Sequence, residues 1–177
     1  MTIADSAKRL KFTRDSQPSP QRDHESERLL RKQETALGYR IMASFGWGAD
    51  GSGHITARDP EHVDCFWLLG YGIPFGEATI DDLVLVNQAG QVVEGTLDIN
   101  PAAFCIHGPI HASRSDVVGV VHTHTPYGTP FSAMAKPLSM TSQEAVAFHG
   151  LQGVFEGEEL NVTDVQTGER IADALGA

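Results

Sequence analysis

Two histidines, His122 and His124, have the residue type and spacing of metal ligands. They follow the apolar run 117–121, which is typical of a buried strand. Side chains at positions i and i+2 of a strand point to the same face, so both imidazoles are expected to project together. Two convergent neutral imidazoles form a large part of many zinc and iron sites. The same spacing also fits two hydrogen-bonded histidines at a strand end, so spacing alone leaves both interpretations open.

Two further histidines, His107 and His111, lie in a stretch expected to be helical, from Pro101 to about Arg114. Residues four positions apart share one face of a helix, and this helix precedes the strand by one short turn. Each histidine could be a metal ligand, a general acid or base, or a packed core residue. The intervening Gly108-Pro109 is expected to kink the helix or to split it into two turns.

The elements that must position these histidines mix helices and strands without regular alternation. Apolar periodicity predicts a helix from Arg28 to about Phe45, and a loop with four glycines follows at residues 46–53. Strands are expected at 54–58, 65–69, 83–86, 91–94 and 117–121, with a final helix over 167–177. This order indicates a sheet flanked by helices.

Composition and length limit the classes of function. Residues 1–28 are polar, carry charges of both signs and predict a flexible tail, whereas 29–177 suit a single domain. A formal net charge of -10 disfavours nucleic acid as a partner. The sequence contains no run near the roughly 20 apolar residues that span a bilayer and no signal-peptide pattern at its start, so no membrane partner and a cytoplasmic location are expected. Cys65 and Cys105 are expected to be buried free thiols.

Several segments resemble, in order and spacing, the signature of the class II aldolase/adducin family. They are residues 100–107, 110–117 and 120–125, the loop 53–58, which is similar to the family's glycine-asparagine-x-serine-x-arginine loop, and the strand and turn at 81–86 and Gly90. The resemblance implies an α/β fold, a three-layer α/β/α sandwich around a mixed, largely antiparallel sheet, and a homotetramer with sites between subunits. It also implies that His122 and His124 hold a divalent cation, Zn²⁺ or Fe²⁺.

Departures from the family pattern bear on the reaction. Ala103 occupies the position of the family's acid/base glutamate, and Pro101 and Ala102 replace adjoining serines. Alanine cannot transfer a proton, and loss of the serines removes hydrogen bonds to a substrate phosphate. His54 replaces the asparagine of the loop. The expected substrate is therefore a small unphosphorylated molecule with a carbonyl or carboxylate group, such as a 2-oxo acid.

The third metal-binding histidine of the family comes from a segment nearer the C-terminus, which this sequence does not match. The sequence has one histidine after His124, namely His149, which becomes the predicted third ligand, with His107, His111 and Glu144 as further candidates. Two explanations stay open: the chain is a truncated version of a longer protein, or its site is rebuilt.

Other residues are candidates for contacts with a substrate. Arg58 could anchor a carboxylate through its guanidinium group, and Tyr127 could donate a hydrogen bond to a developing oxyanion; a strand-end arginine and a half-buried wall residue are the alternatives. The predicted site residues are His107, His111 and Tyr127 for catalysis, Arg58, His54 and Glu144 for substrate binding, and His122, His124 and His149 for the metal.

Three functions are consistent with these residues. The first is a metal-dependent lyase that acts on a C–C bond next to a carbonyl group. The second is a non-haem Fe(II) oxygenase that decarboxylates an aryl-pyruvate, because the sequence is also similar to an aldolase-like branch of aminocoumarin antibiotic pathways. The third is a non-catalytic assembly module like the adducin head domain. Metal content separates the third function from the other two, and oxygen uptake separates the first from the second.

Overall fold

The computed structural model describes residues 22–157 and 162–176, and its longest helix is α1 (His24–Ser44). Asp23 begins this helix, because its side chain accepts a hydrogen bond from the backbone N–H of Ser26 at 2.7 Å. Residues 1–21 of the predicted tail lie outside the described residues. The predicted tail boundary is nevertheless wrong at its end, since 24–28 are helical and Arg28 binds the buried carboxylate of Asp59, with Nε to Oδ2 at 2.7 Å.

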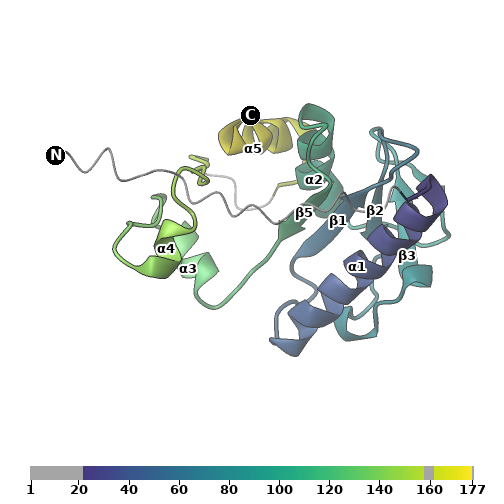
Figure 1. Ribbon diagram of the computed structural model, residues 1–177, viewed down its shortest axis with the longest axis horizontal. Helices are drawn as coiled ribbons and strands as arrows, with labels where there is room; N and C mark the ends of the chain where they lie inside the picture. Colours follow the sequence, from purple (N-terminus) through teal and green to yellow (C-terminus); the bar gives the residue numbers. More distant parts are fainter. Residues whose placement is uncertain (1–21, 158–161, 177) are drawn as a thin grey trace.

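Five strands form one sheet in the order β4-β3-β2-β1-β5 (Figure 1). The strands are β1 (His54–Arg58), β2 (Phe66–Leu69), β3 (Leu83–Val86), β4 (Val92–Glu94) and β5 (Gly119–His122). The two ends of each strand lie within two residues of the ends predicted from the sequence. All four pairings are antiparallel, so within the described residues the sheet is antiparallel rather than mixed.

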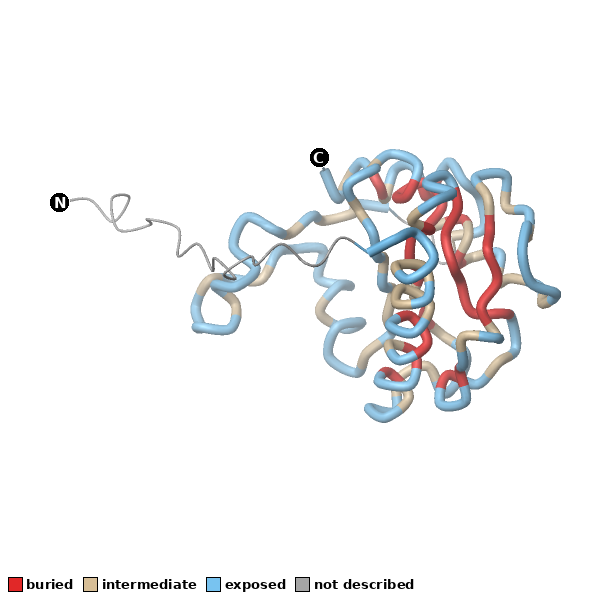
Figure 2. The backbone as a smooth tube through the Cα atoms, turned by 45° about the vertical axis from the view of Figure 1, so that its right-hand side comes forward, coloured by how far each residue is buried: buried red, intermediate tan, exposed pale blue. Residues whose placement is uncertain are grey.

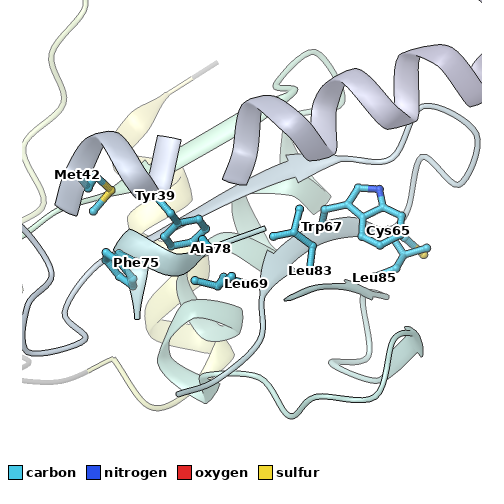
Figure 3. Packing of buried hydrophobic residues seen from close by; sticks show 9 residues of the cluster. All are labelled: Tyr39, Met42, Cys65, Trp67, Leu69, Phe75, Ala78, Leu83 and Leu85. Atoms are coloured by element: carbon cyan, nitrogen blue, oxygen red, sulfur yellow. The ribbon is translucent and has the colours of Figure 1, made fainter. Parts of the chain in front are cut away.

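The central strands bury both of their faces, which explains why they read as continuous apolar runs. One face packs against α1 in a cluster that includes Tyr39, Trp67, Leu69, Leu83 and Leu85 (Figure 3). The opposite face packs against a second helix, α2 (Pro101–Ser113), in a cluster of Phe66, Leu68, Val84, Val86 and Ala103. Alternate residues of β2 and β3 therefore point to opposite layers.

Helix α2 is one helix, not two separate turns, although it contains Pro109. A proline has no N–H for the carbonyl group four residues earlier, here that of Cys105. The last helix, α5 (Val165–Leu175), approaches α2 at this carbonyl through Gly168, where any Cβ atom would collide with it. Helices α2 and α5 thus form the third layer, and the predicted three-layer α/β/α arrangement is confirmed. Both cysteines are free and buried, as predicted.

The chain between β5 and α5 differs from this body. Residues 125–157, called here the projecting segment, extend away from the sheet and contain the short helices α3 (Gly128–Ser132) and α4 (Gln143–Val146) (Figure 1). None of these residues is buried (Figure 2). Two 3₁₀ turns, η2 (Phe75–Glu77) and η3 (Ile80–Asp82), lead into β3. Of the helices in the described ranges, none combines the length and the apolar character required to cross a bilayer.

Candidate metal centre

The pairing of β1 with β5 places His54 directly opposite His122. Opposite residues of an antiparallel pair share a face, and here Nδ1 of His122 lies 3.0 Å from Nε2 of His54. Gly53 makes this approach possible, because it has φ of 101° and a Cβ atom there would lie 2.8 Å from the carbonyl oxygen of His122. The glycine next to His54 is therefore required by the close packing of the two strands.

The rings of His122 and His124 lie next to each other, with centroids 4.8 Å apart. His124 is exposed, whereas His122 is partly buried. Burial lowers the pKa of His122, and the neighbouring His124 lowers it further. The neutral imidazole is the form that binds a metal. Because Nδ1 of His122 is engaged with His54, Nε2 is the nitrogen that remains for a metal ion.

Three more side chains extend the contact from His122 into the interior. Nδ1 of His54 lies 2.9 Å from Nε2 of His107. The hydroxyl oxygen of Thr56 lies 2.8 Å from Nδ1 of His107 and also 2.8 Å from Nε2 of His111. We call this series, His122–His54–His107–Thr56–His111, the histidine line. It joins His54 and Thr56, which lie two positions apart on one face of β1, to His107 and His111, which lie four positions apart on one face of α2.

The inner members of the histidine line are shielded from water: His107 is 0% exposed, His111 3% and His54 4%. Burial lowers the pKa of His54 to about 3, with smaller effects from His122 and His124. Burial, followed by the charge of Arg58, lowers the pKa of His111 to about 4, although the backbone of Val117 opposes this. Burial also holds the pKa of His107 well below its ordinary value. These imidazoles are therefore neutral at physiological pH.

A cavity of about 910 Å³ opens beside His54, His122 and His124. Much of its wall is aromatic or aliphatic, formed by Tyr39, Trp47, Leu68, Leu69, Tyr71, Ile73, Phe75 and Ile106. None of the described residues that line it is lysine or arginine. Ala103 also lines it, four residues before His107 on α2. The described lining thus offers imidazoles, apolar surface and the polar side chains of Asp50, Ser52 and Asn100, but no lysine or arginine for a phosphate.

The prediction that Arg58 anchors a substrate carboxylate does not agree with its surroundings. Arg58 is 7% exposed. Its guanidinium donates to the backbone carbonyl groups of Val117 at 3.0 Å, His111 at 2.6 Å and Arg114 at 2.8 Å, and also to that of Val63. These bonds tie the end of α2 to the start of β5. The group is consequently structural, and a substrate carboxylate would have to displace buried bonds to reach it.

His107 and His111 were predicted to move protons, but they lie too deep to touch a substrate. His107 is fully enclosed between His54 and Thr56, and neither His107 nor His111 lines the cavity. His54, predicted to bind substrate, does line the cavity, yet both of its ring nitrogens are bonded to other histidines. The structure therefore does not support a direct contact of His107 or His111 with a substrate in this cavity.

Three predicted site residues lie on the projecting segment. Tyr127 is 89% exposed, and Glu144 and His149 are exposed as well. None of the three lines the cavity beside His122. Across residues 22–157 and 162–176, no three His, Cys, Asp or Glu side chains are grouped to hold a metal ion. The structure therefore does not bring the predicted third ligand to the histidine pair.

Sequence reasoning missed Thr56, which joins His107 to His111. Its signal was present, because Thr56 occupies the serine position of the loop pattern at 53–58 and lies two residues after His54 on the same strand face. A threonine in a strand is usually explained by β-propensity, so the residue attracts no attention until α2 is placed beside it.

The family model described as "Class II Aldolase and Adducin N-terminal domain" matches residues 33–177. The chain belongs to the class II aldolase and adducin family. A solved structure described as an L-fuculose 1-phosphate aldolase from Glaciozyma antarctica PI12 is similar, with a TM-score of 0.79 and 36% identity, over 91% of this chain and 63% of that chain.

Two curated relatives come from Streptomyces. "Decarboxylase NovR" of Streptomyces niveus is 39% identical over 150 residues, 84% of this chain and 56% of the relative. "4-hydroxy-3-prenylphenylpyruvate oxygenase/4-hydroxy-3-prenylbenzoate synthase" of Streptomyces roseochromogenus subsp. oscitans is also 39% identical, over 84% of this chain and 54% of the relative. The chain thus spans about half the length of these relatives.

The residues at the centre fit a divalent transition metal in their donor chemistry. His122 and His124 are adjacent imidazoles, and His122 has one ring nitrogen held by His54 and the other left over. A metal-binding histidine usually has its second nitrogen fixed in this way. The pair supplies two ligands, and zinc and iron sites take further ligands from protein, water or substrate.

Proposed function

We propose that this chain is a metal-dependent, lyase-type enzyme that acts on a C–C bond next to the carbonyl group of a small, unphosphorylated substrate such as a 2-oxo acid. One observation carries the proposal: the His122–His124 pair borders a cavity with many aromatic and aliphatic side chains in its wall and no lysine or arginine among its described lining residues. The names of the Streptomyces relatives, a decarboxylase and a prenylphenylpyruvate oxygenase, support the same substrate class.

His122 and His124 would hold the divalent ion. When bound, such an ion polarises a carbonyl oxygen and stabilises the negative charge that develops as the neighbouring bond breaks. His54 fixes the ring of His122 from behind through the 3.0 Å contact between their nitrogens. The position that carries an acid/base glutamate in the family's aldolases is Ala103, which lines the cavity without a proton-transferring group.

The apolar wall would bind the organic part of the substrate and exclude water from it. Trp47 and Phe75 line the cavity with Tyr39, whose ring meets that of Phe75 edge to face at 4.8 Å between centroids. Aromatic walls of this kind suit an aryl or other flat apolar group. A phosphate group, in contrast, would find no cationic side chain among the described lining residues.

A non-haem Fe(II) oxygenase is the second candidate, and a specific observation favours it. The relative from Streptomyces roseochromogenus subsp. oscitans is named as an oxygenase of a prenylated phenylpyruvate. Replacement of the acid/base glutamate by Ala103 is compatible with oxidative decarboxylation, because that chemistry needs no retro-aldol base. Both candidates use the same two histidines and the same cavity, so they differ in the metal and in the need for oxygen.

The deciding experiment measures metal content by mass spectrometry after anaerobic purification. The wild-type chain is compared with His122→Ala/His124→Ala, and with His62→Ala as a control at an exposed histidine outside the centre. Stoichiometric metal that is lost only in the double variant supports the metal centre. Iron with oxygen uptake on aryl-pyruvates favours the oxygenase, whereas zinc, manganese or cobalt with oxygen-independent cleavage favours the lyase. No metal in the wild type, even after reconstitution, overturns the proposal in favour of a non-catalytic, adducin-like assembly module.

We further propose that the enzyme is a cytoplasmic homotetramer. The projecting segment supports assembly, because Met134, Val146, Phe148 and Leu151 are large apolar side chains that are each more than half exposed. A neighbouring copy would also be a source of a further metal ligand. The two buried free cysteines suit a reducing compartment. Light scattering coupled to size-exclusion chromatography tests the assembly, and a monodisperse monomer would contradict it.

A further inference from the structure

We propose that His54, His107, Thr56 and His111 together hold His122 in the one tautomer whose Nε2 atom can bind a metal. These four are positioning residues that act through His122 and do not touch the substrate. The inference rests on the proposed metal role of His122 and adds a task for a buried cluster that the reaction itself does not use.

Counting protons along the histidine line gives the first step. Its four contacts join five groups: four neutral imidazoles, each with one N–H, and one hydroxyl with one O–H. Each contact needs one proton between its two heavy atoms, so four of the five protons are used. The fifth proton lies at one end of the line or, where the oxygen of Thr56 accepts both of its hydrogen bonds, on the hydroxyl group of Thr56.

Three arrangements satisfy this count, because an imidazole that donates at one contact must accept at the other, whereas the hydroxyl oxygen of Thr56 can accept at both of its contacts. In the outward arrangement, every group donates towards His122 and the spare proton is on Nε2 of His122. In the inward arrangement, every group donates towards His111 and the spare proton is on Nδ1 of His111. In the converging arrangement, His107 and His111 both donate to Thr56, His122 and His54 donate towards His107, and the spare proton is the one on the hydroxyl group. A metal ion needs the lone pair of Nε2 of His122, so it is compatible with the inward and converging arrangements and excludes the outward one.

The inner end of the line distinguishes the inward from the converging arrangement. Nδ1 of His111 is buried and has no hydrogen-bond partner. The inward arrangement would place an N–H there as a buried donor without an acceptor, which is costly, so the converging arrangement is favoured over the inward one. In both arrangements, His122, His54 and His107 each donate from Nδ1, and the hydroxyl oxygen of Thr56 accepts the last of these hydrogen bonds.

Thr56 is the member that makes the line continuous. Its hydroxyl contacts Nδ1 of His107 and Nε2 of His111, both at 2.8 Å, and a hydroxyl can accept from one while donating to the other. Without it, Nδ1–H of His107 has no acceptor, and the tautomers of His107, His54 and His122 that leave Nε2 of His122 bare lose this hydrogen bond. Thr56 is also 0% exposed and lies outside the cavity lining, so a substitution there changes no contact with a ligand.

The variant pair Thr56→Val and Thr56→Ser tests this role. Valine keeps the shape of threonine but has no hydroxyl, whereas serine keeps the hydroxyl. The Zn²⁺ affinity of the metal-free chain is measured by competition with a chromophoric chelator. Thr56→Val is expected to weaken Zn²⁺ binding about 10-fold, the lower end of the range for residues behind a metal ligand, and Thr56→Ser to change it less than about threefold. Equal affinities for Thr56→Val and the wild type overturn the proposal.

A second measurement uses the unaltered chain and so does not depend on a variant that folds. Nitrogen-15 NMR of the metal-free protein reports which ring nitrogen of each histidine carries the proton. The proposal predicts Nδ1–H with a bare Nε2 for His122, and likewise for His54 and His107. A proton on Nε2 of His122 in the metal-free chain would refute it.

These outcomes separate the histidine line from the proposed function. If His122→Ala/His124→Ala keeps its metal, the proposed metal centre fails, whatever the tautomers are. If that double variant loses the metal but Thr56→Val binds as tightly as the wild type, the metal centre stands and the role of the histidine line fails alone.

Discussion

The three-layer body and the projecting segment differ in how firmly they place a side chain. In the body, His54, Thr56, His107 and His111 are at most 4% exposed and are linked by hydrogen bonds. In the projecting segment, residues 125–157, no residue is buried, and its two helices have five and four residues. Helices this short gain little stability from their own hydrogen bonds.

This difference divides the predicted site. The histidines predicted on β1, α2 and β5 meet at one place, because strand pairing and helix packing leave them little freedom. Residues predicted on the projecting segment, such as Tyr127 and His149, do not reach that place. A rigid scaffold on one side and an exposed segment on the other are typical of sites that other chain segments complete.

The largest difference in unfolding free energy between the body and the projecting segment is expected when an aromatic side chain is removed from each. Trp67 is 0% exposed, and its indole N–H donates to Oδ2 of Asp59 at 2.9 Å. Trp67→Ala should lower the free energy of unfolding by about 3–5 kcal/mol through the cavity it leaves. Tyr127→Ala removes a side chain that is 89% exposed and should change it by less than about 0.5 kcal/mol. Urea denaturation of the two variants measures both values, and a loss of more than 2 kcal/mol for Tyr127→Ala would show that the segment packs more firmly than described.

A smaller difference in unfolding free energy between the body and the projecting segment is expected when a carboxylate is replaced by an amide. Asp59 is 0% exposed and accepts hydrogen bonds from Arg28, Trp67 and the backbone N–H groups of Glu61 and His62. Asp59→Asn leaves the charge of Arg28 without its buried partner and should cost about 3 kcal/mol of unfolding free energy.

The exposed Glu144 offers the matched control for this change. Glu144→Gln makes the same chemical replacement on the projecting segment and should cost less than about 0.5 kcal/mol. Equal losses for the two variants, measured by urea denaturation at pH 7, would contradict the distinction between the body and the segment.

The pH dependence of stability gives a third test of Asp59. Burial by itself raises the pKa of this carboxyl group, but hydrogen bonds from Arg28, His62, Glu61 and Trp67 outweigh it and lower the pKa from 3.8 to about 2. A lowered folded-state pKa stabilises the protein above the ordinary value, and this stabilisation is lost as the pH falls from about 4 to about 2. The difference between the two values corresponds to on the order of 2 kcal/mol.

The measurement compares the free energy of unfolding of the wild type and of Asp59→Asn at several pH values between 5 and 2.5. The wild type should lose stability more steeply, so the gap between the two proteins should narrow by on the order of 2 kcal/mol towards low pH. A gap that is constant over this range would mean that Asp59 titrates with an ordinary pKa in the folded protein.

Local pattern was sufficient to predict much of the body. Apolar runs identify β2 and β3, and the i, i+2 spacing of His122 and His124 places their rings side by side. The register that sets His54 opposite His122 is a contact between residues far apart in the chain, and single-sequence patterns contain no information about it. Arg58 shows the same limit, because its carbonyl partners on α2 and before β5 are known only once both elements are packed.

The start of α1 illustrates another limit. The polar residues 24–28 suggest a tail, yet they are helical because Arg28 reaches the buried carboxylate of Asp59. Tertiary contacts override local composition at such positions. Similarly, α2 continues through Pro109, since the lost hydrogen bond falls where α5 packs through Gly168.

The smallest effect, a change in Zn²⁺ affinity, is expected from replacing His149. This variant tests most directly whether the projecting segment contributes to the site in the three-layer body. If the three-layer body supplies all the protein ligands of one chain, His149→Ala should leave the Zn²⁺ affinity within about threefold of the wild type. His122→Ala should lower the Zn²⁺ affinity by about 100-fold or more, because it removes a direct ligand, and residues behind a ligand already contribute about 10-fold to 100-fold. The competition assay with a chromophoric chelator measures both variants, and light scattering on the same samples reports their assembly. A large loss of affinity for His149→Ala together with an unchanged oligomer would mean that the projecting segment folds back to the histidine pair when metal binds. A loss that appears only in the assembled form would instead place His149 in the site of a neighbouring copy, and the exposed segment would then be the element that connects subunits through the metal.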